Sequence, residues 1–368
     1  MINETKRTKK AREALFHISK RGAMPWYGSL FVRIAAVAVA LLLSSVLAYF
    51  LIGTGNPLKL LSTLVDGSFG SERRLWKFAK DLAVLLCIAL AVTPAFRMKF
   101  WNIGAEGQVL VGALAAIGCA FYIKDAVPNA VLLIIMVAAA IIAGAIWAVL
   151  PAIFKAFWNT NETLFTLMMN YIATSLVAFS LIKWTPDGSS ALGIVEFGYL
   201  PEVIHPYFVL IVAVAALTVG IYIYLYHSKH GYEVSVVGES EKTACYIGIN
   251  VKKVIIRTML VSGAICGVAG FLIVAALDHT VTTATVGGLG FTAIMVSWLA
   301  KFNPFIMMAT SALIVFLNQG SSQMSTTYNI SSAFPNVIVG IILFFIIGCE
   351  FFINYQIKFR KMKGGADQ

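Results

Sequence analysis

Long uninterrupted apolar runs constrain this chain more than any other feature of its sequence. A helix needs about 20 consecutive apolar residues to cross roughly 30 Å of hydrocarbon, and several such runs recur along the chain. The 368 residues are 59% hydrophobic and 12% charged, with a mean hydropathy of +0.84, which excludes an ordinary soluble domain. The sequence therefore predicts an all-α integral membrane protein.

The runs predict about ten membrane-spanning helices. Their expected bounds are 31–52, 81–97, 106–123, 129–154, 163–183, 206–227, 254–277, 289–300, 304–319 and 335–353. The first run is too long for a signal-peptide core and lacks a small-x-small cleavage site, so we expect it to be retained. The expected organisation is an N-terminal tail (1–30), a transmembrane domain (31–353) with a long loop at 228–253, and a C-terminal tail (354–368).

The formal net charge of +11 first raises the question of nucleic-acid binding. The lysines and arginines, however, cluster in tails and loops beside apolar runs, which is the pattern of a membrane protein with its basic loops in the cytoplasm. The pattern predicts both termini in the cytoplasm and no nucleic-acid partner. One predicted external loop, 66–81, is also basic, and two interpretations remain open. Its cations reach lipid headgroups from an interfacial helix, or Arg73 and Arg74 form a docking patch for an acidic partner.

Two glycine-rich segments interrupt the apolar pattern. "NIGAEGQ" (102–108) precedes the short run 106–123, and "TVGGLGF" (285–291) precedes the shorter run 289–300. Short or glycine-interrupted spans at matching places in two halves indicate a transport site. The odd offset between these spans predicts an inverted repeat, and we expect the two breaks to lie on opposite sides of a substrate path.

Polar residues near these breaks are the candidate gate. Glu106 falls in the first turn of a helix, so one interpretation is a brace that pairs with Arg97, Lys99 or nearby backbone N–H groups. The other makes it part of a gate with Asn102 and Gln108. Asn161 suits an N-cap, whereas Asn170 lies within an apolar run and should face protein or a cavity. The candidate path and gate residues are Asn102, Gly104, Glu106, Gln108, Asn161, Glu162, Asn170, Gly287, Gly288 and Gly290.

The sequence contains no pattern for catalysis or metal binding. It has no Gly-Lys dipeptide and hence no P-loop, so we expect no nucleotide hydrolysis by that route on this chain. It also lacks a credible Ser-His-Asp set and a metal-type cluster of His or Cys, so the expected catalytic and metal sites are none. In the loop 227–253 the stretch 239–246 predicts a short amphipathic helix, which is either a solvated connection or a docking element.

Four segments, in this order, resemble the permease subunits of bacterial ABC importers for nucleosides and simple sugars, the branched-chain amino acid and ribose type. They are "FWNIGAEGQVLVGALAA", "NETLFTLMMNYIA", "GYEVSVVGESEKTACYIGINVKK" and "GGLGFTAIMVSWLAKFNPF". The similarity covers about residues 68–350 and is greatest to nucleoside permeases. Lys80 and Asp81 stand where relatives usually have a proline, and "FRMKFW" replaces a common "FRAG" pattern.

The resemblance implies a type II importer fold of ten helices in the bacterial cytoplasmic membrane. It implies three partners: a cytoplasmic ATPase that binds ATP and Mg, a second permease that forms a heterodimer with this one, and an extracytoplasmic substrate-binding lipoprotein. No cofactor is expected on this chain. The residues carried over to ATPase coupling are Gly231, Gly238, Glu239, Ala244 and Gly248.

Three alternatives to a nucleoside importer follow from the same sequence. A permease for simple sugars differs only in its substrate. A proton-coupled transporter would need ionisable residues deep in the spans, and Glu106, Glu162, Asp81, Asp278 and Glu350 all fall near expected helix ends. A structural or assembly protein would not need paired helix breaks.

Overall fold

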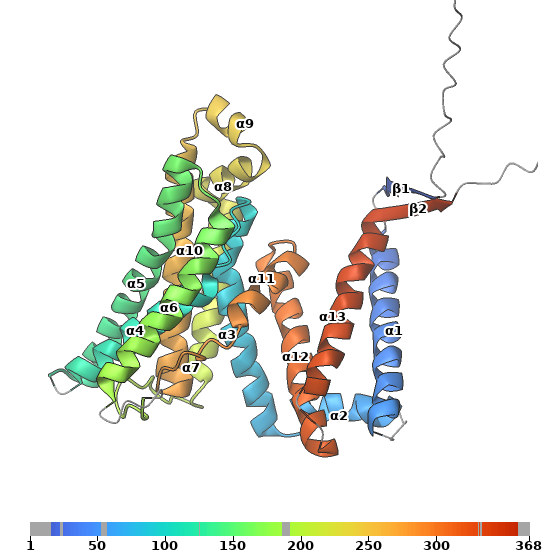
Figure 1. The fold of residues 1–368 in the computed structure, drawn as a ribbon, viewed down its shortest axis with the longest axis horizontal. Helices are drawn as coiled ribbons and strands as arrows, with labels where there is room; N and C mark the ends of the chain where they lie inside the picture. The colour runs from blue at the N-terminus through green and yellow to red at the C-terminus, as the bar shows by residue number, and fades with distance from the viewer. Residues whose placement is uncertain are drawn as a thin grey trace, which may run out of the picture. The chain divides into compact units, whose positions relative to one another are not determined.

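The structure, a computed structural model, describes residues 16–22, 25–52, 57–124, 126–185, 192–329, 331 and 333–359. The chain forms two compact units (Figure 1). The larger unit is Val65–Gln319, and the smaller unit combines Met1–Leu64 with Gly320–Gln368. The charged ends of both predicted tails, 1–15 and 360–368, lie outside the described residues.

The larger unit is built from α-helices, with its longest connection, 185–207, between α6 and α7. Its helices are α3 (Glu72–Arg97), α4 (Ala105–Ile123), α5 (Asn129–Trp158), α6 (Glu162–Trp184), α7 (Phe208–His227), α8 (Lys229–Glu239), α9 (Glu241–Tyr246), α10 (Val251–Ile273) and α11 (Leu289–Leu299). A π-helical turn, η1 (Val274–Asp278), extends α10. The boundary between the units falls within α2 (Pro57–Phe69) and α12 (Pro304–Tyr328).

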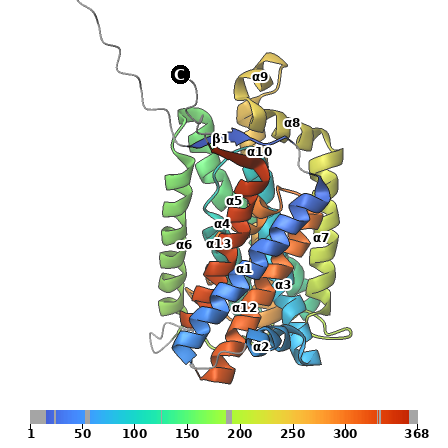
Figure 2. The same ribbon diagram turned by 90° about the vertical axis from the view of Figure 1, so that its right-hand side faces the viewer.

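The smaller unit pairs the two ends of the described chain. Helix α1 (Trp26–Ile52) packs against α13 (Ala333–Asn354), and Figures 1 and 2 show the two helices side by side. Strand β1 (Phe16–Lys20) pairs antiparallel with β2 (Tyr355–Phe359), with Phe16 opposite Phe359 and Lys20 opposite Tyr355. The predicted tails therefore contain a strand each within their described parts, and the first helix begins earlier than expected.

Glycines bring the central helices of the larger unit into close contact. Helix α10 packs against α3, α4 and α5. A Cβ atom on Gly267 would overlap the carbonyl oxygen of Ala140, and one on Gly112 would lie 2.7 Å from the Cα atom of Gly267. Gly144 and Gly263 contact each other's backbone in the same way. The Gly263-x-x-x-Gly267 pattern is therefore a helix-packing motif, as small residues at this spacing commonly are.

The predicted spans are confirmed as helices, with large errors in length at two of them. The expected span 304–319 ends nine residues too early, because α12 continues to Tyr328. Nine helices in the described residues are long and apolar enough to cross a membrane, and α11 is a shorter apolar helix of 11 residues. The expected short span 81–97 is wrong, because α3 begins at Glu72 and has 26 residues. Its first turns carry charges that mask the helix from a hydropathy criterion, and the Ser71 side chain caps them by accepting from the Arg74 N–H.

Candidate functional site

The first break is held together by its own amides. Asn102 is fully buried, and its Oδ1 accepts from the Gly104 N–H at 3.1 Å and from the Gln108 amide at 3.1 Å. The Asn102 amide donates to the Gln108 Oε1 at 3.3 Å. Two of these bonds join the two side chains, and the third satisfies the N–H group of Gly104, the N-cap residue of α4.

Asn170 secures the same break from a different helix. Its amide on α6 donates to the carbonyl of Ile103 at 2.9 Å, and its Oδ1 accepts from the Gly107 N–H at 2.9 Å. Gly107 is required here, because a Cβ atom would lie 2.8 Å from the Asn170 Oδ1. The expectation that Asn170 faces protein inside the bundle is confirmed.

Glu106 links the two breaks to each other. The N–H groups of Gly288 and Gly290 each donate to a different oxygen of this carboxylate, both at 2.7 Å. Gly288 has φ of +82° and is the N-cap residue directly before α11. A carboxylate at the positive end of α11 satisfies N–H groups that have no partner within that helix.

This contact confirms one of the alternatives for Glu106 and corrects two details. Glu106 is a brace that accepts from backbone N–H groups, but these groups belong to the second break and not to its own turn. It does not pair with Arg97 or Lys99, and the guanidinium of Arg97 lies over the ring of Tyr226 at 4.5 Å. The two breaks also do not lie on opposite sides of a path, because α4 and α11 begin against each other. Only glycine fits at Gly290, since a Cβ atom there would lie 2.6 Å from the Glu106 nitrogen.

Asn161 and Glu162 serve the junction between α5 and α6. The Asn161 side chain accepts from the Leu164 N–H at 3.2 Å, which confirms it as the N-cap of α6. Glu162 pairs with Lys155 at 3.0 Å. The described contacts of both side chains stay at this junction, so the structure does not bring them together with Glu106.

A cavity of about 240 Å³ lies beside the second break, and none of the predicted gate residues lines it. Its walls come from α3, the end of α10 with η1, the segment before α11 and the middle of α12. The polar lining residues are Lys80, Asp81, Asp278, Thr285, Asn318 and Gln319. Sequence reasoning missed this site because it placed Asp81 at a helix end, whereas α3 begins nine residues earlier. The signal was present in Lys80 and Asp81, which replace an expected proline.

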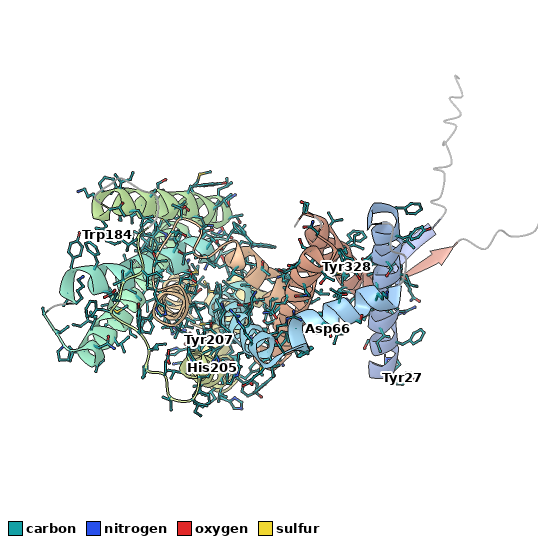
Figure 3. All side chains as sticks on the ribbon, turned by 90° about the horizontal axis from the view of Figure 1, so that it is seen from below. Tyr27, Asp66, Trp184, His205, Tyr207 and Tyr328 are labelled. Atoms are coloured by element: carbon teal, nitrogen blue, oxygen red, sulfur yellow. The ribbon has the colours of Figure 1, made fainter. Side chains whose placement is uncertain are left out.

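A second, open groove lies at the N-terminal end of α3. It is lined by Arg73, Arg74 and Lys77 together with the segment 205–207. His205 stacks on Trp76 at 4.0 Å between ring centroids, and Figure 3 shows His205 close to Tyr207. The Arg74 guanidinium donates to the Asp66 carbonyl at 2.7 Å, so this arginine also closes the end of α2.

The long loop forms two helices at the other end of α3. Gly238 packs on the Arg97 carbonyl with no room for a Cβ atom, Gly231 packs equally closely on the end of α7, and Ala244 is fully buried. Gly248 has φ of +86°, and the Glu239 side chain is exposed. The predicted helix at 239–246 is therefore divided at Ser240, which caps α9.

An ion pair anchors this loop to the bundle. The guanidinium of Arg257 on α10 donates to the Glu233 carboxylate at 2.8 Å. That hydrogen bond lowers the pKa of Glu233 below its ordinary value, so the carboxylate stays charged at neutral pH. In contrast, α9 exposes Tyr246 at 92% and Ile247 at 50%. The loop thus has a fixed helix, α8, and an exposed apolar tip.

The nine long apolar helices of the described residues are those of a multi-pass membrane protein, and paired helix breaks are typical of transporters. A sequence model of the family described as "Branched-chain amino acid transport system / permease component" matches residues 75–347. The chain belongs to this permease family. Five cysteines are present, all of them free, and the described residues contain no group of three or more His, Cys, Asp or Glu side chains placed to hold a metal ion.

Several characterised permeases are similar to this chain over most of their length. The glucose ABC transporter permease protein TsgB13 of Haloferax volcanii is 28% identical over 77% of this chain and 78% of its own. The guanosine ABC transporter permease protein NupP of Bacillus subtilis is 28% identical over 81% of this chain and 86% of its own. The nucleoside ABC transporter permease protein NupB of Lactococcus lactis is 25% identical over 79% of this chain and 84% of its own.

Proposed function

We propose that this chain is the permease subunit of an ATP-driven importer that carries nucleosides across the cytoplasmic membrane. The similarity to guanosine and nucleoside permeases over about four fifths of the chain carries this proposal. The similarity to a glucose permease favours a simple sugar as the second candidate. Both substrate classes contain a small carbon skeleton with several hydroxyl groups.

The experiment that tests this proposal measures uptake by cells. Deletion of the gene for this chain is expected to abolish uptake of labelled guanosine or uridine while uptake of glucose and ribose is unchanged. Restoring the gene on a plasmid is the control. Loss of sugar uptake alone would replace the nucleoside by the second candidate, and unchanged uptake of both classes would contradict the proposal.

The proposed energy source is a separate cytoplasmic ATPase, which binds ATP and Mg and docks on the exposed tip of α9. A short helix with an apolar end fits a groove on a partner protein, and Tyr246 and Ile247 supply that end. Both termini then lie in the cytoplasm, with the N-terminal end of α3 outside. A second permease completes the pore in this proposal.

The coupling proposal predicts different defects for two residues of the loop. Tyr246→Ala is expected to reduce ATP-driven uptake at least about tenfold with a normal amount of folded protein, because an exposed aromatic anchor contributes about 2 kcal/mol at a docking surface. Gly238→Ala is expected to reduce the amount of folded protein, because a methyl group there has no space. Uptake per folded molecule separates the two effects. Normal coupling in Tyr246→Ala would remove α9 as the docking element.

The extracytoplasmic lipoprotein is proposed to dock at the basic groove near Arg73. Reversing charges with Arg73→Glu and Lys77→Glu is expected to weaken lipoprotein binding at least about tenfold at low salt, with less effect at high salt. Both side chains are exposed. Arg74 is left unchanged because it bonds the end of α2. Surface plasmon resonance on the purified complex measures the affinity, and an unchanged value would return these cations to a headgroup role.

A further inference from the structure

A glutamine oxygen in the cavity wall lacks a partner. Gln319 on α12 is only 7% exposed, and its amide nitrogen donates to the Asp81 carboxylate at 2.8 Å. The carboxylate can only accept, so this bond fixes the amide orientation and places Oε1 away from Asp81. The Gln319 Oε1 is buried and accepts no hydrogen bond from any residue that the structure describes. Such a buried acceptor costs about 1 to 3 kcal/mol unless something supplies a donor.

The volume of the cavity limits the size of the bound group that supplies this hydrogen-bond donor. A volume of about 240 Å³ equals the space of about eight waters at roughly 30 Å³ each. It lies below the range of about 300 to 1,000 Å³ of pockets that enclose a whole drug-sized ligand. The cavity therefore suits one sugar-sized group better than an entire nucleoside.

The chemistry of the walls points to a neutral group rich in hydroxyls. The carboxylates of Asp81 and Asp278 outnumber the single ammonium of Lys80, which lies 3.5 Å from Asp81, so a phosphate ester would be repelled. Carboxylate and amide oxygens accept from hydroxyl groups. None of the described residues that line the cavity is aromatic, whereas proteins commonly stack bases on aromatic rings.

We propose that this cavity holds the sugar moiety of the transported molecule, with vicinal hydroxyls donating to the Gln319 Oε1 and to Asp81. The inference rests on the proposed function and specifies the part of the substrate that this site recognises. Thr285 and Leu289 connect the cavity to the second break. A sugar held there lies next to the segment that Glu106 fixes from the other half of the fold.

The test compares uptake of uridine with uptake of 2′,3′-dideoxyuridine in cells that carry the complete transporter. We expect Gln319→Leu to lower the ratio of the two uptake rates about 3- to 10-fold, the effect of one hydrogen bond. The lipoprotein is the same in both strains, so a change in the ratio comes from the permease. The matched control is Gln323→Leu, one turn further along α12, whose amide donates to Thr327 instead; its ratio is expected to equal that of the wild type.

The outcomes separate this inference from the function on which it rests. No uptake of nucleosides by the wild type would contradict the proposed function. Uptake by the wild type with an unchanged ratio in Gln319→Leu would overturn the sugar site and leave the function intact. If Gln319→Leu abolishes all uptake, the ratio cannot be measured. In that case a Thr285→Cys variant with an unchanged Gln319 tests whether substrate occupies the cavity.

The second measurement reads occupancy of the cavity directly. The rate at which a maleimide modifies Cys at position 285 is measured by mass spectrometry in the assembled transporter. Uridine is expected to slow this rate at least about threefold, and dideoxyuridine at the same concentration is expected to leave it unchanged. Equal rates with and without uridine, or equal protection by both compounds, would overturn the proposed site.

Discussion

Replacing Glu106 with glutamine is expected to reduce substrate uptake by about 100-fold while the protein still folds. The carboxylate accepts from two backbone N–H groups at 2.7 Å, and an amide offers one oxygen and presents an N–H group to the other donor. A hydrogen bond to a charged group contributes about 1.5 to 3 kcal/mol. Loss of one such bond releases the start of α11 from α4.

Hydrogen exchange measures this release at the atoms concerned. The Gly288 and Gly290 amides are expected to exchange at least about tenfold faster in Glu106→Gln than in the wild type. Glu202→Gln, a change at an exposed loop carboxylate, is the control and should alter neither exchange nor uptake. Normal uptake by Glu106→Gln would show that the joined breaks have no role in transport.

Replacing Gly267 with leucine is expected to remove most of the folded protein from the membrane. The glycine lies where α10 approaches α5 and α4, and even a Cβ atom would overlap the Ala140 carbonyl. The leucine side chain then forces the two helix backbones apart, and their van der Waals contacts are lost. The hydrophobic effect does not offset this loss, because lipid tails are as apolar as the helix surfaces. Overpacking of a close contact costs about 3 kcal/mol, a large part of the stability of a typical domain.

Detergent extraction followed by size-exclusion chromatography measures the amount of folded chain. Gly220→Leu is the matched control, because a Cβ atom at this exposed position on α7 meets nothing within 4 Å. Gly267→Leu should yield at most about a tenth of the monodisperse protein obtained from the control. An equal yield from both variants would mean that the helices do not pack through Gly267.

The helices were predictable from the sequence because apolar runs are a local signal. The two glycine breaks were predictable for the same reason, as was the Asn161 cap. The N-terminal extension of α3 was not, because charged residues hide a helix from a hydropathy criterion. The extension changes the place of Lys80 and Asp81 from a helix end to its interior.

The contacts between the two breaks could not be predicted from the sequence. Glu106 and Gly288 are 182 positions apart, and no local pattern relates them. The inverted repeat expected from the sequence predicts two such segments but does not predict where they meet, and our expectation of opposite sides was wrong. The cavity beside Gln319 depends on four separate segments in the same way. The residues at the breaks and caps were thus recognisable from neighbouring glycines or helix starts. The cavity residues could be noticed only as polar residues in unusual places.

The position of Asp81 bears on whether transport is driven by ATP or by a proton gradient. A carboxylate within α3 gives a proton-coupled mechanism one ionisable group inside a span. In the structure this carboxylate accepts from the Gln319 amide and pairs with Lys80. The two mechanisms differ in what drives uptake.

Transport into vesicles that contain the complete importer distinguishes ATP-driven import from proton-coupled transport. The chain is purified with the proposed ATPase and the proposed second permease, incorporated into liposomes with the proposed lipoprotein added on the substrate side, and supplied with labelled uridine. Our account predicts uptake that requires ATP and Mg on the cytoplasmic side and that a proton gradient does not replace. Uptake driven by a proton gradient without ATP would contradict it.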